Sequence, residues 1–214
     1  MKITILCSSN KHPVNAYLEQ WVKSYQHAHE IDVVRNKTDL SGGDILFLIS
    51  CTEIISDADR CAFKNVLVIH ASDLPHGRGW SPHVWQIIEG KEEIVLSMLE
   101  ARDMVDSGDI WKKLSVFIPK NALYDEINQL IFDAELSLID HAIASFHANQ
   151  PVPQDPTISA TYYPKRTPKD SRIDPKQSIE SQFNLIRVCD PDRYPAFFDL
   201  HGQRYRLRLE KSDE

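Results

Sequence analysis

Two short, uninterrupted apolar runs limit the fold of this chain more than any other feature. They cover residues 45–49 and 66–69, within stretches 44–50 and 66–71 that are rich in Ile, Val and Leu. Such runs are typical of buried strands in a parallel sheet, because helices cover both faces of that kind of sheet. They are also too short to cross a membrane as helices, and no longer apolar run occurs elsewhere. We therefore expect a sheet with buried strands and no membrane-spanning segment.

The stretches around these runs alternate between helical and extended patterns. Over residues 13–27, apolar residues recur at the spacing of one helix face, with Pro13 near the first turn. Three further strands and one further helix are predicted at residues 2–7, 31–35 and 94–99 and at residues 82–89. Alternating strands and helices are typical of an α/β sheet that carries helices on its faces.

The chain changes character near residue 150. A long helix is predicted over residues 123–147, with Asn121 as its N-cap. Six prolines between residues 150 and 175 then indicate an extended crossing segment. The remaining predicted elements are a helix over residues 179–188 and a hairpin of residues 196–200 and 205–209 around His201 and Gly202. We place a domain boundary here, between a larger domain (1–150) and a C-terminal extension (151–214).

Charge and composition narrow the classes of function. The net charge of −7 argues against a nucleic-acid partner held by a broadly basic surface. The first residues, Met-Lys-Ile-Thr-Ile-Leu-Cys, lack the features of a signal peptide, which predicts a cytoplasmic protein. The four cysteines show no paired spacing, and the nine histidines show no metal-ligand spacing with cysteine or acidic residues. We therefore expect reduced thiols and no metal ion.

The block from His70 to Asp109 contains a histidine and several of the few glycines of the chain. Only seven glycines occur in the chain, and those at positions 77, 79, 90 and 108 lie in or beside this block. Glycine is needed where the backbone turns sharply or approaches a ligand. His70 ends a predicted buried strand, and ligands of open α/β sheets bind at the carboxyl ends of strands. Taken singly, each residue also fits an ordinary turn or a core histidine, but together they predict a ligand site.

Three motifs give the chain a resemblance to a known enzyme family. After His70, a Ser-x-Leu-Pro and Arg-Gly pattern is formed by Ser72, Leu74, Pro75, Arg78 and Gly79. A second loop reads Asp106-Ser107-Gly108, and a third motif covers residues 48–56. Together they resemble the formyltransferases that use 10-formyltetrahydrofolate, which include glycinamide ribonucleotide formyltransferase, methionyl-tRNA formyltransferase and the sugar N-formyltransferases. The resemblance covers about residues 1–150 and implies a Rossmann-like formyltransferase domain.

This resemblance implies roles for individual residues. His70 and Asp106 match the catalytic pair, in which the imidazole moves a proton and stabilises the developing oxyanion, while the carboxylate orients water and keeps the imidazole protonated. The residues implied to bind the co-substrate 10-formyltetrahydrofolate are Leu48, Cys51, Glu53, Ile54, Ile55, Asp103 and Val105. The candidates for binding the acceptor are Ser8, Asn10, Ser72, Arg78, Gly79, Trp80, Tyr163, Lys165 and Arg166.

Motifs of the C-terminal extension suggest the acceptor. Residues 165–174, 183–187 and 194–197 resemble the pattern that follows the catalytic domain in sugar-nucleotide N-formyltransferases. Residues 78–82 are similar to those of a subgroup that formylates 4-amino sugars on a UDP carrier, and the same phrase recurs in formylation domains of peptide synthetases. The implied function is N-formylation of a nucleotide-linked amino sugar, such as a UDP-linked 4-amino-4,6-dideoxy sugar, for polysaccharide biosynthesis.

Other functions stay open at this point. A methionyl-tRNA formyltransferase is disfavoured because that subgroup carries a larger C-terminal domain, and only about 64 residues follow residue 150 here. The motifs are also compatible with a formyltransferase associated with a peptide synthetase and with a folate-binding protein that lacks catalysis. The predicted C-terminal hairpin offers an edge for pairing with a second copy, so a homodimer is a further hypothesis.

One position departs from the family pattern. Two residues before the catalytic histidine the family usually has Asn, whose amide donates to the formyl oxygen, whereas this chain has Val68. Side chains alternate along a strand, so Val68 and His70 share a face and Asn65 points to the other. Loss of one oxyanion donor typically lowers the rate by about 10²–10³. Asn10, in the loop after the first predicted strand, is a speculative replacement.

Overall fold

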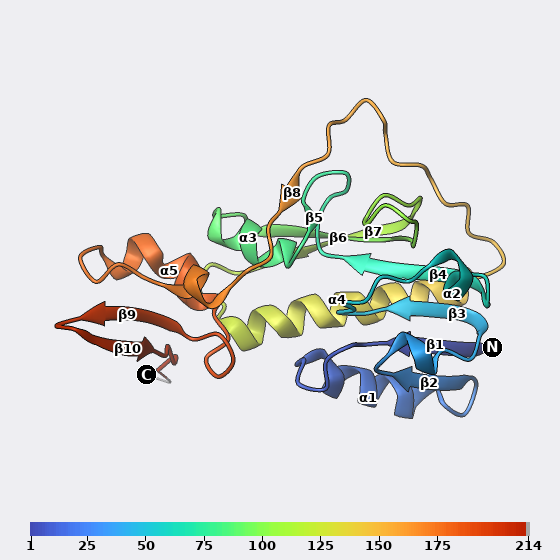
Figure 1. The fold of residues 1–214 in the computed structure, drawn as a ribbon, viewed down its shortest axis with the longest axis horizontal. Coiled ribbons are helices and arrows are strands. Elements are labelled where there is room, and N and C mark those ends of the chain that lie inside the picture. Colours follow the sequence, from blue (N-terminus) through green and yellow to red (C-terminus); the bar gives the residue numbers. More distant parts are fainter. Residues whose placement is uncertain (213–214) are drawn as a thin grey trace.

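A six-stranded sheet forms the centre of the structure, a computed structural model that describes residues 1–212 (Figure 1). The strand order in the sheet is β2-β1-β3-β4-β6-β7. In chain order these strands are β1 (Lys2–Leu6), β2 (Glu30–Val34), β3 (Gly43–Leu48), β4 (Phe63–His70), β6 (Glu93–Glu100) and β7 (Ile110–Phe117). The first four run parallel, whereas β4 pairs antiparallel with β6 and β6 with β7. The prediction of an α/β fold with a mostly parallel sheet is confirmed.

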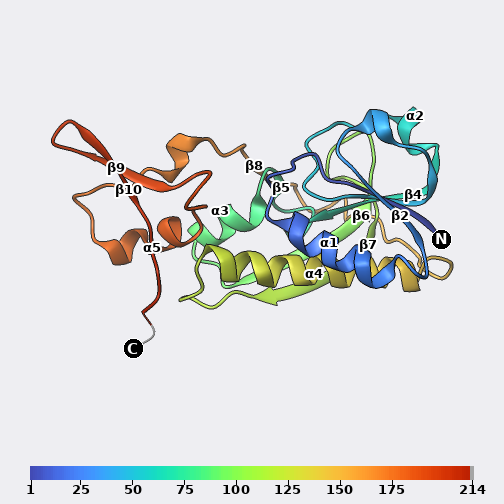
Figure 2. The same cartoon turned by 90° about the horizontal axis from the view of Figure 1, so that it is seen from below.

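Two helices cover one face of this sheet and lie side by side (Figure 2). They are α1 (Val14–Tyr25) and α4 (Tyr124–Ala144), and the indole Nε1 of Trp21 donates to Oδ1 of Asp140 at 2.7 Å between them. Two shorter helices lie in the loops between strands, α2 (Asp57–Arg60) before β4 and α3 (Pro82–Ile88) before β6. Within residues 1–212, no helix combines the length and the apolar character needed to cross a membrane.

The two apolar runs occupy β3 and β4, in the middle of the sheet. On one face, Phe47 and Leu67 belong to the main core, which α1 and α4 complete. On the other face, Leu46 and Val66 pack in a smaller cluster that Ile55 closes from the loop after β3. Because both faces are covered, both strands are built mainly from apolar residues.

The start of α4 differs from the prediction. Asn121 is not the N-cap, since the helix begins at Tyr124 and Leu123 takes the capping position. The leucine side chain cannot accept a hydrogen bond, and instead Oε2 of Glu126 accepts the backbone N–H of Leu123 at 2.8 Å. A carboxylate inside the first turn therefore replaces the amide cap that the sequence suggested.

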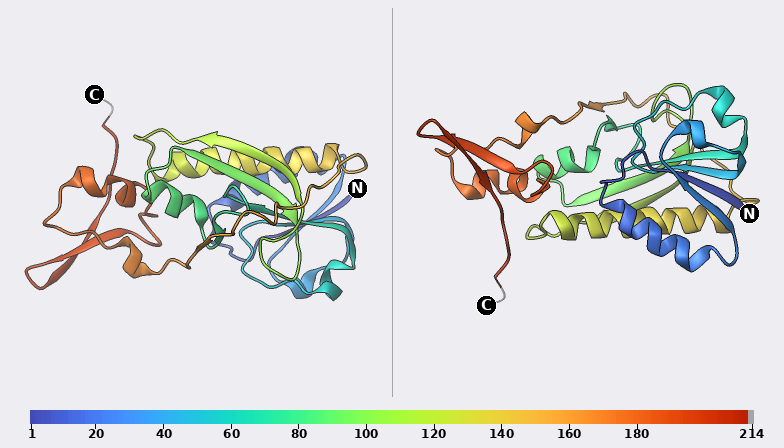
Figure 3. Two further views of the ribbon diagram at one scale, coloured as in Figure 1. Left: turned by 90° about the horizontal axis from the view of Figure 1, so that it is seen from above. Right: turned by 60° about the horizontal axis from the view of Figure 1, so that its bottom comes forward.

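The C-terminal extension crosses the larger domain as an extended segment and ends in a small unit at one end of the molecule (Figure 3). Its elements are β8 (Tyr162–Tyr163), a 3₁₀ turn (Pro168–Ser171), α5 (Ile179–Arg187), β9 (Ala196–Leu200) and β10 (Gln203–Leu207). Strand β10 begins at Gln203, two residues before the predicted start. The reason is the tight turn: His201 and Gly202 both have positive φ, 51° and 77°, as a two-residue hairpin turn requires.

Arg187 joins this unit to the larger domain. The side chain is almost fully buried, and its Nη1 donates to the carbonyl oxygens of Pro119 at 2.9 Å and Ala122 at 3.2 Å. These carbonyls lie in the turn before α4, so α5 and α4 are fixed relative to one another. Burial lowers the pKa of Arg187, but a guanidinium remains charged at neutral pH.

A buried carboxyl group in α4 makes stability depend on pH. Oε2 of Glu135 is shielded from solvent and has no hydrogen-bond partner within residues 1–212, and burial raises the pKa of Glu135 from 4.5 to about 8. Between these two pH values the folded chain retains a proton on Glu135 that the unfolded chain releases. The contribution of the protonated Glu135 to the free energy of unfolding is therefore complete below pH 4.5 and is lost as the pH rises to about 8. We expect Glu135→Gln to raise the melting temperature by several degrees above pH 8 and to change it little near pH 4.5.

Thermal unfolding at the two pH values tests this expectation. Asp133→Asn is the matched control, because Asp133 is exposed on the same helix. The control should shift the melting temperature equally at both pH values. A gain for Glu135→Gln that is equally large at low pH would contradict a protonated, buried Glu135.

Candidate active site

His70 and Asp106 lie together at the carboxyl end of β4. The imidazole Nδ1 is 3.5 Å from Oδ1 of Asp106, and the two residues are only 7% and 9% exposed. The other carboxylate oxygen, Oδ2, accepts the backbone N–H of Gly79 at 2.9 Å. The imidazole Nε2 is 2.8 Å from the carbonyl oxygen of Gly77, and because a carbonyl only accepts, Nε2 carries the hydrogen of that contact. The structure thus brings the two predicted catalytic side chains into one buried pair.

Asp106 reaches His70 through a tightly folded loop after β6. The loop leaves the sheet beside β4, where the N–H of Ala101 donates to the carbonyl of Val66 at 2.8 Å. It returns at Gly108, where an added Cβ would lie 1.8 Å from the carbonyl oxygen of Glu100. A side chain at position 108 therefore cannot be accommodated without a backbone shift, which explains the glycine of the Asp-x-Gly motif.

Backbone strain is concentrated at the same end of the sheet. Four non-glycine residues within 1–212 have positive φ, and three of them, Ser50, Ser81 and Asp106, lie in loops around the His70 pair. The fourth is His201 in the hairpin turn. Left-handed conformations of non-glycine residues are costly and collect at functional sites, because the surrounding structure holds them for a purpose. Strain therefore independently marks these loops as a functional region.

Residues 152–163 of the extended crossing segment complete the site, and the sequence analysis missed two of its contributors, Gln154 and Thr161. The side-chain amide of Gln154 donates to the carbonyls of Asp106 and Gly108, both at 2.9 Å, and accepts from Nη2 of Arg78 at 2.7 Å. The hydroxyl of Thr161 accepts the N–H of Gly77 at 2.8 Å. No local motif marks Gln154 or Thr161, since their partners lie far away in the sequence.

Strand pairing fixes the loop after His70 on this segment. Residues Arg78–Gly79 form the short strand β5, which pairs with β8. Gly79 has a φ of 99°, and an added Cβ would lie 2.4 Å from the carbonyl oxygen of Tyr163. The glycine is therefore required twice, by its conformation and by the close approach of β8.

Two loops beside the pair carry the residues predicted to bind the co-substrate. Arg60 forms an ion pair with Asp103, which links α2, just after the first loop, to the loop after β6. Ile54, Met104 and Val105 are 68%, 63% and 54% exposed on these loops. Large exposed apolar side chains on adjacent loops fit an apolar, planar ligand.

Most of the other residues predicted to bind the co-substrate make contacts within the chain. Leu48 and Ile55 are buried in the smaller apolar cluster, so only their backbone is available to a ligand. The Glu53 carboxylate accepts the N–H of Lys37 at 3.2 Å. Ser8, predicted to contact the acceptor, also binds this loop: its hydroxyl accepts the N–H of Thr52 at 3.1 Å and lies 3.6 Å from Sγ of Cys51.

The residues predicted to bind the acceptor differ in exposure and in their contacts. Ser72 is buried with its hydroxyl unpaired among residues 1–212, whereas Asn10 is exposed in the turn before α1. Lys165 lies over the Trp80 ring, with Nζ 4.4 Å from the ring centre, and Trp80 remains 40% exposed. Tyr163 stacks on Trp85 and donates its hydroxyl to Glu89 at 2.7 Å; burial and this carboxylate raise the pKa of Tyr163.

Two histidines that the sequence analysis did not single out lie near the pair. Burial lowers the pKa of His83 to about 4, and the charges of His12, His70 and Arg166 act in the same direction. Burial also lowers the pKa of His12 to about 4. Both rings are therefore neutral near pH 7 and can present a hydrogen-bond donor and an acceptor. No spacing in the sequence links these histidines to His70, so only the fold shows that they gather there.

Sequence comparison places the chain among known proteins. No family model matches it. A methionyl-tRNA formyltransferase from Protochlamydia amoebophila (strain UWE25) is 30% identical over 177 residues, which cover 79% of this chain and 54% of that protein. The chain is thus similar in sequence to a formyltransferase over most of its own length. It spans about half the length of the methionyl-tRNA formyltransferases that it matches.

Solved structures share the fold of this chain over nearly its whole length. The methionyl-tRNA formyltransferase from Clostridium thermocellum matches with a TM-score of 0.80 at 23% identity, covering 100% of this chain and 94% of that one. A 4-N formyltransferase from Francisella tularensis gives 0.72 at 17%, covering 100% and 98%. HypX from Aquifex aeolicus, in complex with tetrahydrofolic acid, gives 0.75 at 17%, covering 95% and 36%. At these identities the likeness concerns the fold.

Proposed function

We propose that the chain transfers a formyl group from 10-formyltetrahydrofolate to a primary amine, with His70 and Asp106 as the catalytic pair. The observation that carries this proposal is the buried His70–Asp106 contact between loops that expose Ile54, Met104 and Val105. The exposed apolar side chains fit a flat pterin ring. The tetrahydrofolate complex of HypX, a protein of the same fold, supports a folate as donor.

We propose separate tasks for the two side chains. The donor supplies the formyl carbon: its bond to N10 breaks, and a bond to the amine nitrogen forms. A proton leaves the amine and another reaches N10, so a group that both accepts and donates is needed. Nε2 of His70 is suited to this, because only the Gly77 carbonyl occupies it and an incoming oxyanion can replace that acceptor. Asp106 orients the imidazole from the Nδ1 side.

For the acceptor, we propose a nucleotide-linked amino sugar, such as a UDP-linked 4-amino-4,6-dideoxy sugar. The support is the C-terminal pattern of the sequence and the fold match over nearly the full length of the 4-N formyltransferase. Methionyl-tRNA is the second candidate, favoured by the name of the relative from Protochlamydia. It is disfavoured by the net charge of −7, because tRNA binding generally relies on basic surfaces.

One experiment separates the candidates. The protein is incubated with 10-formyltetrahydrofolate and, in parallel, with UDP-, dTDP- and GDP-linked 4-amino sugars and with methionyl-tRNA, and the gain of one formyl group is measured by mass spectrometry. We expect formylation of a sugar nucleotide. Formylation of methionyl-tRNA alone would replace the proposed acceptor. Calorimetry with a 10-formyltetrahydrofolate analogue that detects no binding would overturn the donor assignment.

Restoring the usual family residue at position 68, with Val68→Asn, is not expected to improve the enzyme. Val68 is half-buried in the smaller apolar cluster, in register with Leu48 and Leu99. An Asn amide without partners there costs roughly 1–3 kcal/mol. We therefore expect Val68→Asn to lower the melting temperature. We also expect it not to accelerate formyl transfer, because the neutral His12 and His83 can already supply a hydrogen-bond donor to the oxyanion.

Thermal unfolding and turnover of the acceptor found in the screen test this prediction. Val68→Ala is the control for lost packing: it should also lower the melting temperature and leave the rate unimproved. A rate increase of about tenfold or more for Val68→Asn would show that the chain lacks an oxyanion donor.

A further inference from the structure

Arg193 is held rigidly in the turn between α5 and β9. Its Nε forms an ion pair with the buried Asp190, and the same carboxylate accepts the backbone N–H of Arg193 at 2.9 Å. Its Nη2 donates to the hydroxyl of Tyr124 at 3.1 Å, and that hydroxyl donates to Asp190 at 2.8 Å. Within residues 1–212 no hydrogen bond uses Nη1. One edge of the guanidinium is therefore fixed and the other is available.

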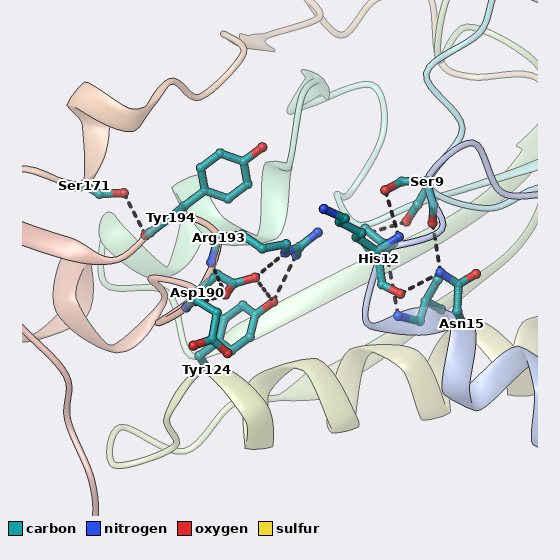
Figure 4. A network of polar contacts seen from close by, with 12 residues as sticks. Ser9, His12, Asn15, Tyr124, Ser171, Asp190, Arg193 and Tyr194 are labelled. Atoms are coloured by element: carbon teal, nitrogen blue, oxygen red, sulfur yellow. Dashed lines mark hydrogen bonds and ion pairs between the residues drawn. The ribbon is translucent and has the colours of Figure 1, made fainter. Parts of the chain in front are cut away.

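The available edge is directed toward His12, in the turn before α1 (Figure 4). The N–H of Val14 donates to Nδ1 of His12 at 3.3 Å, so the ring hydrogen resides on Nε2, which lies 3.3 Å from the Ser50 hydroxyl. The Arg193 charge reaches His12, since it contributes to the lowered pKa of that ring. A fixed cation thus faces a neutral imidazole at the carboxyl ends of β1 and β3.

The extension carries a second arginine, Arg166, just before the 3₁₀ turn. Nη2 of Arg166 donates to the carbonyl of Asp170 at 3.1 Å, whereas its buried Nε has no partner within residues 1–212. The neighbouring Ser171 hydroxyl donates to the carbonyl of Tyr194 at 3.3 Å, which ties the two arginine-bearing segments together. The charge of Arg166 acts on His83, as that of Arg193 acts on His12. The extension therefore presents two braced guanidinium groups to the histidines beside His70.

We propose that Arg193, positioned by Asp190 and Tyr124, binds a phosphate group of the acceptor on the side facing His12, with Arg166 as the second cation of the same anion site. The planar guanidinium edge suits bidentate contact with phosphate oxygens, and prior bracing reduces the entropy lost on binding. The inference rests on the proposed function, because it assumes an acceptor whose amine lies at His70. It then assigns the phosphate part of that acceptor to Arg193. It makes Arg193 a specificity-determining residue outside the larger domain.

Three other cations of the extension make contacts of their own. Arg172 forms an ion pair with Asp199, and so does Arg204. Lys165 lies over the Trp80 ring. The choice of Arg193 therefore follows from its geometry rather than from a general positive charge of the extension, which also carries many carboxylates.

Titration calorimetry with inorganic pyrophosphate on the intact protein tests the site. We expect Arg193→Gln to weaken pyrophosphate binding about tenfold or more, as loss of a charge-assisted contact does. Arg172→Gln is the matched control and should leave binding unchanged, because that arginine already pairs with Asp199 at the surface. Arg193→Lys keeps the charge without the planar fork and should fall between. The Lys variant also tests the proposal if the Gln variant does not fold. In that case, pyrophosphate binding by Arg193→Lys that equals binding by the unaltered protein would refute the bidentate contact.

Two further measurements separate this inference from the proposed function. Malonate, a dicarboxylate, is titrated in parallel; tighter binding of malonate than of pyrophosphate would overturn the assignment to phosphate. A 10-formyltetrahydrofolate analogue is titrated into the same variants and should bind each equally. If the analogue binds and pyrophosphate does not, the anion site fails and the donor assignment stands. If pyrophosphate binds through Arg193 and no folate binds, the reverse holds.

Discussion

Replacing His70 by Asn is expected to lower turnover by about 10²–10⁴-fold, because Asn can hydrogen-bond but cannot move a proton. The shorter Asn amide does not reach the Gly77 carbonyl that Nε2 contacts, but Gly77 is also held by Thr161, so the loop after β4 should keep its position. Turnover is measured with the acceptor identified by the formylation screen. Binding of the 10-formyltetrahydrofolate analogue should be unchanged, which separates lost chemistry from a lost site.

Asp106→Asn should produce a loss of similar order, about 10²-fold or more. Asn tolerates the left-handed conformation of position 106, and its side-chain oxygen can still accept the Gly79 N–H. The variant therefore removes the charge beside His70 with little change of shape. Asp109→Asn is the control, since that carboxylate lies in the same loop and, within residues 1–212, pairs only with the exposed Arg102. Near-normal turnover of folded Asp106→Asn would remove Asp106 from the catalytic pair.

Gly108→Ala is expected to be the most destabilising of the simple glycine replacements. The new Cβ would lie 1.8 Å from the carbonyl oxygen of Glu100, so the backbone of β6 or of the Asp106 loop must move. Overpacking typically costs about 1–3 kcal/mol and occasionally more, and here the shift also disturbs Asp106. We expect the free energy of unfolding to fall by at least about 3 kcal/mol in urea denaturation, together with loss of turnover.

Gly202→Ala provides the comparison. This glycine has a φ of 77° and nothing within 4 Å of an added Cβ, so only the conformational cost of about 1–2 kcal/mol applies. Turnover should be unaffected, because the hairpin turn lies outside the site. If Gly108→Ala were as mild as Gly202→Ala, the close approach to Glu100 would not exist in solution.

Local patterns were sufficient for the central strands and the long helices. The runs in β3 and β4 are apolar because both faces are buried, and this pattern is visible without any partner. Strand β7 escaped prediction because exposed Lys112 and Lys113 interrupt its apolar residues at the edge of the sheet. The two-residue strands β5 and β8 have no periodicity at all and exist only because the crossing segment passes over Gly79.

The candidate site shows the same division between local and distant information. His70, Gly79, Asp106 and Gly108 stand in short motifs that the sequence displays, although Asp106 meets His70 and Gly79 meets β8 only in the fold. Gln154 reads as an ordinary polar residue among prolines. Its three hydrogen bonds to the site depend on where the chain crosses the sheet, which no spacing in the sequence specifies.

The crossing segment has a practical consequence for how the protein fails. Residues 155–159 are exposed between the two anchoring side chains, Gln154 and Thr161, so a protease can reach the backbone there. A single cut would leave the six-stranded sheet and its core intact. It would free one anchor from the other, and the loops of Gly77 and Asp106 would lose their shared support. Inactivation by a nick at this point should therefore precede any loss of circular dichroism or of the cooperative melting transition.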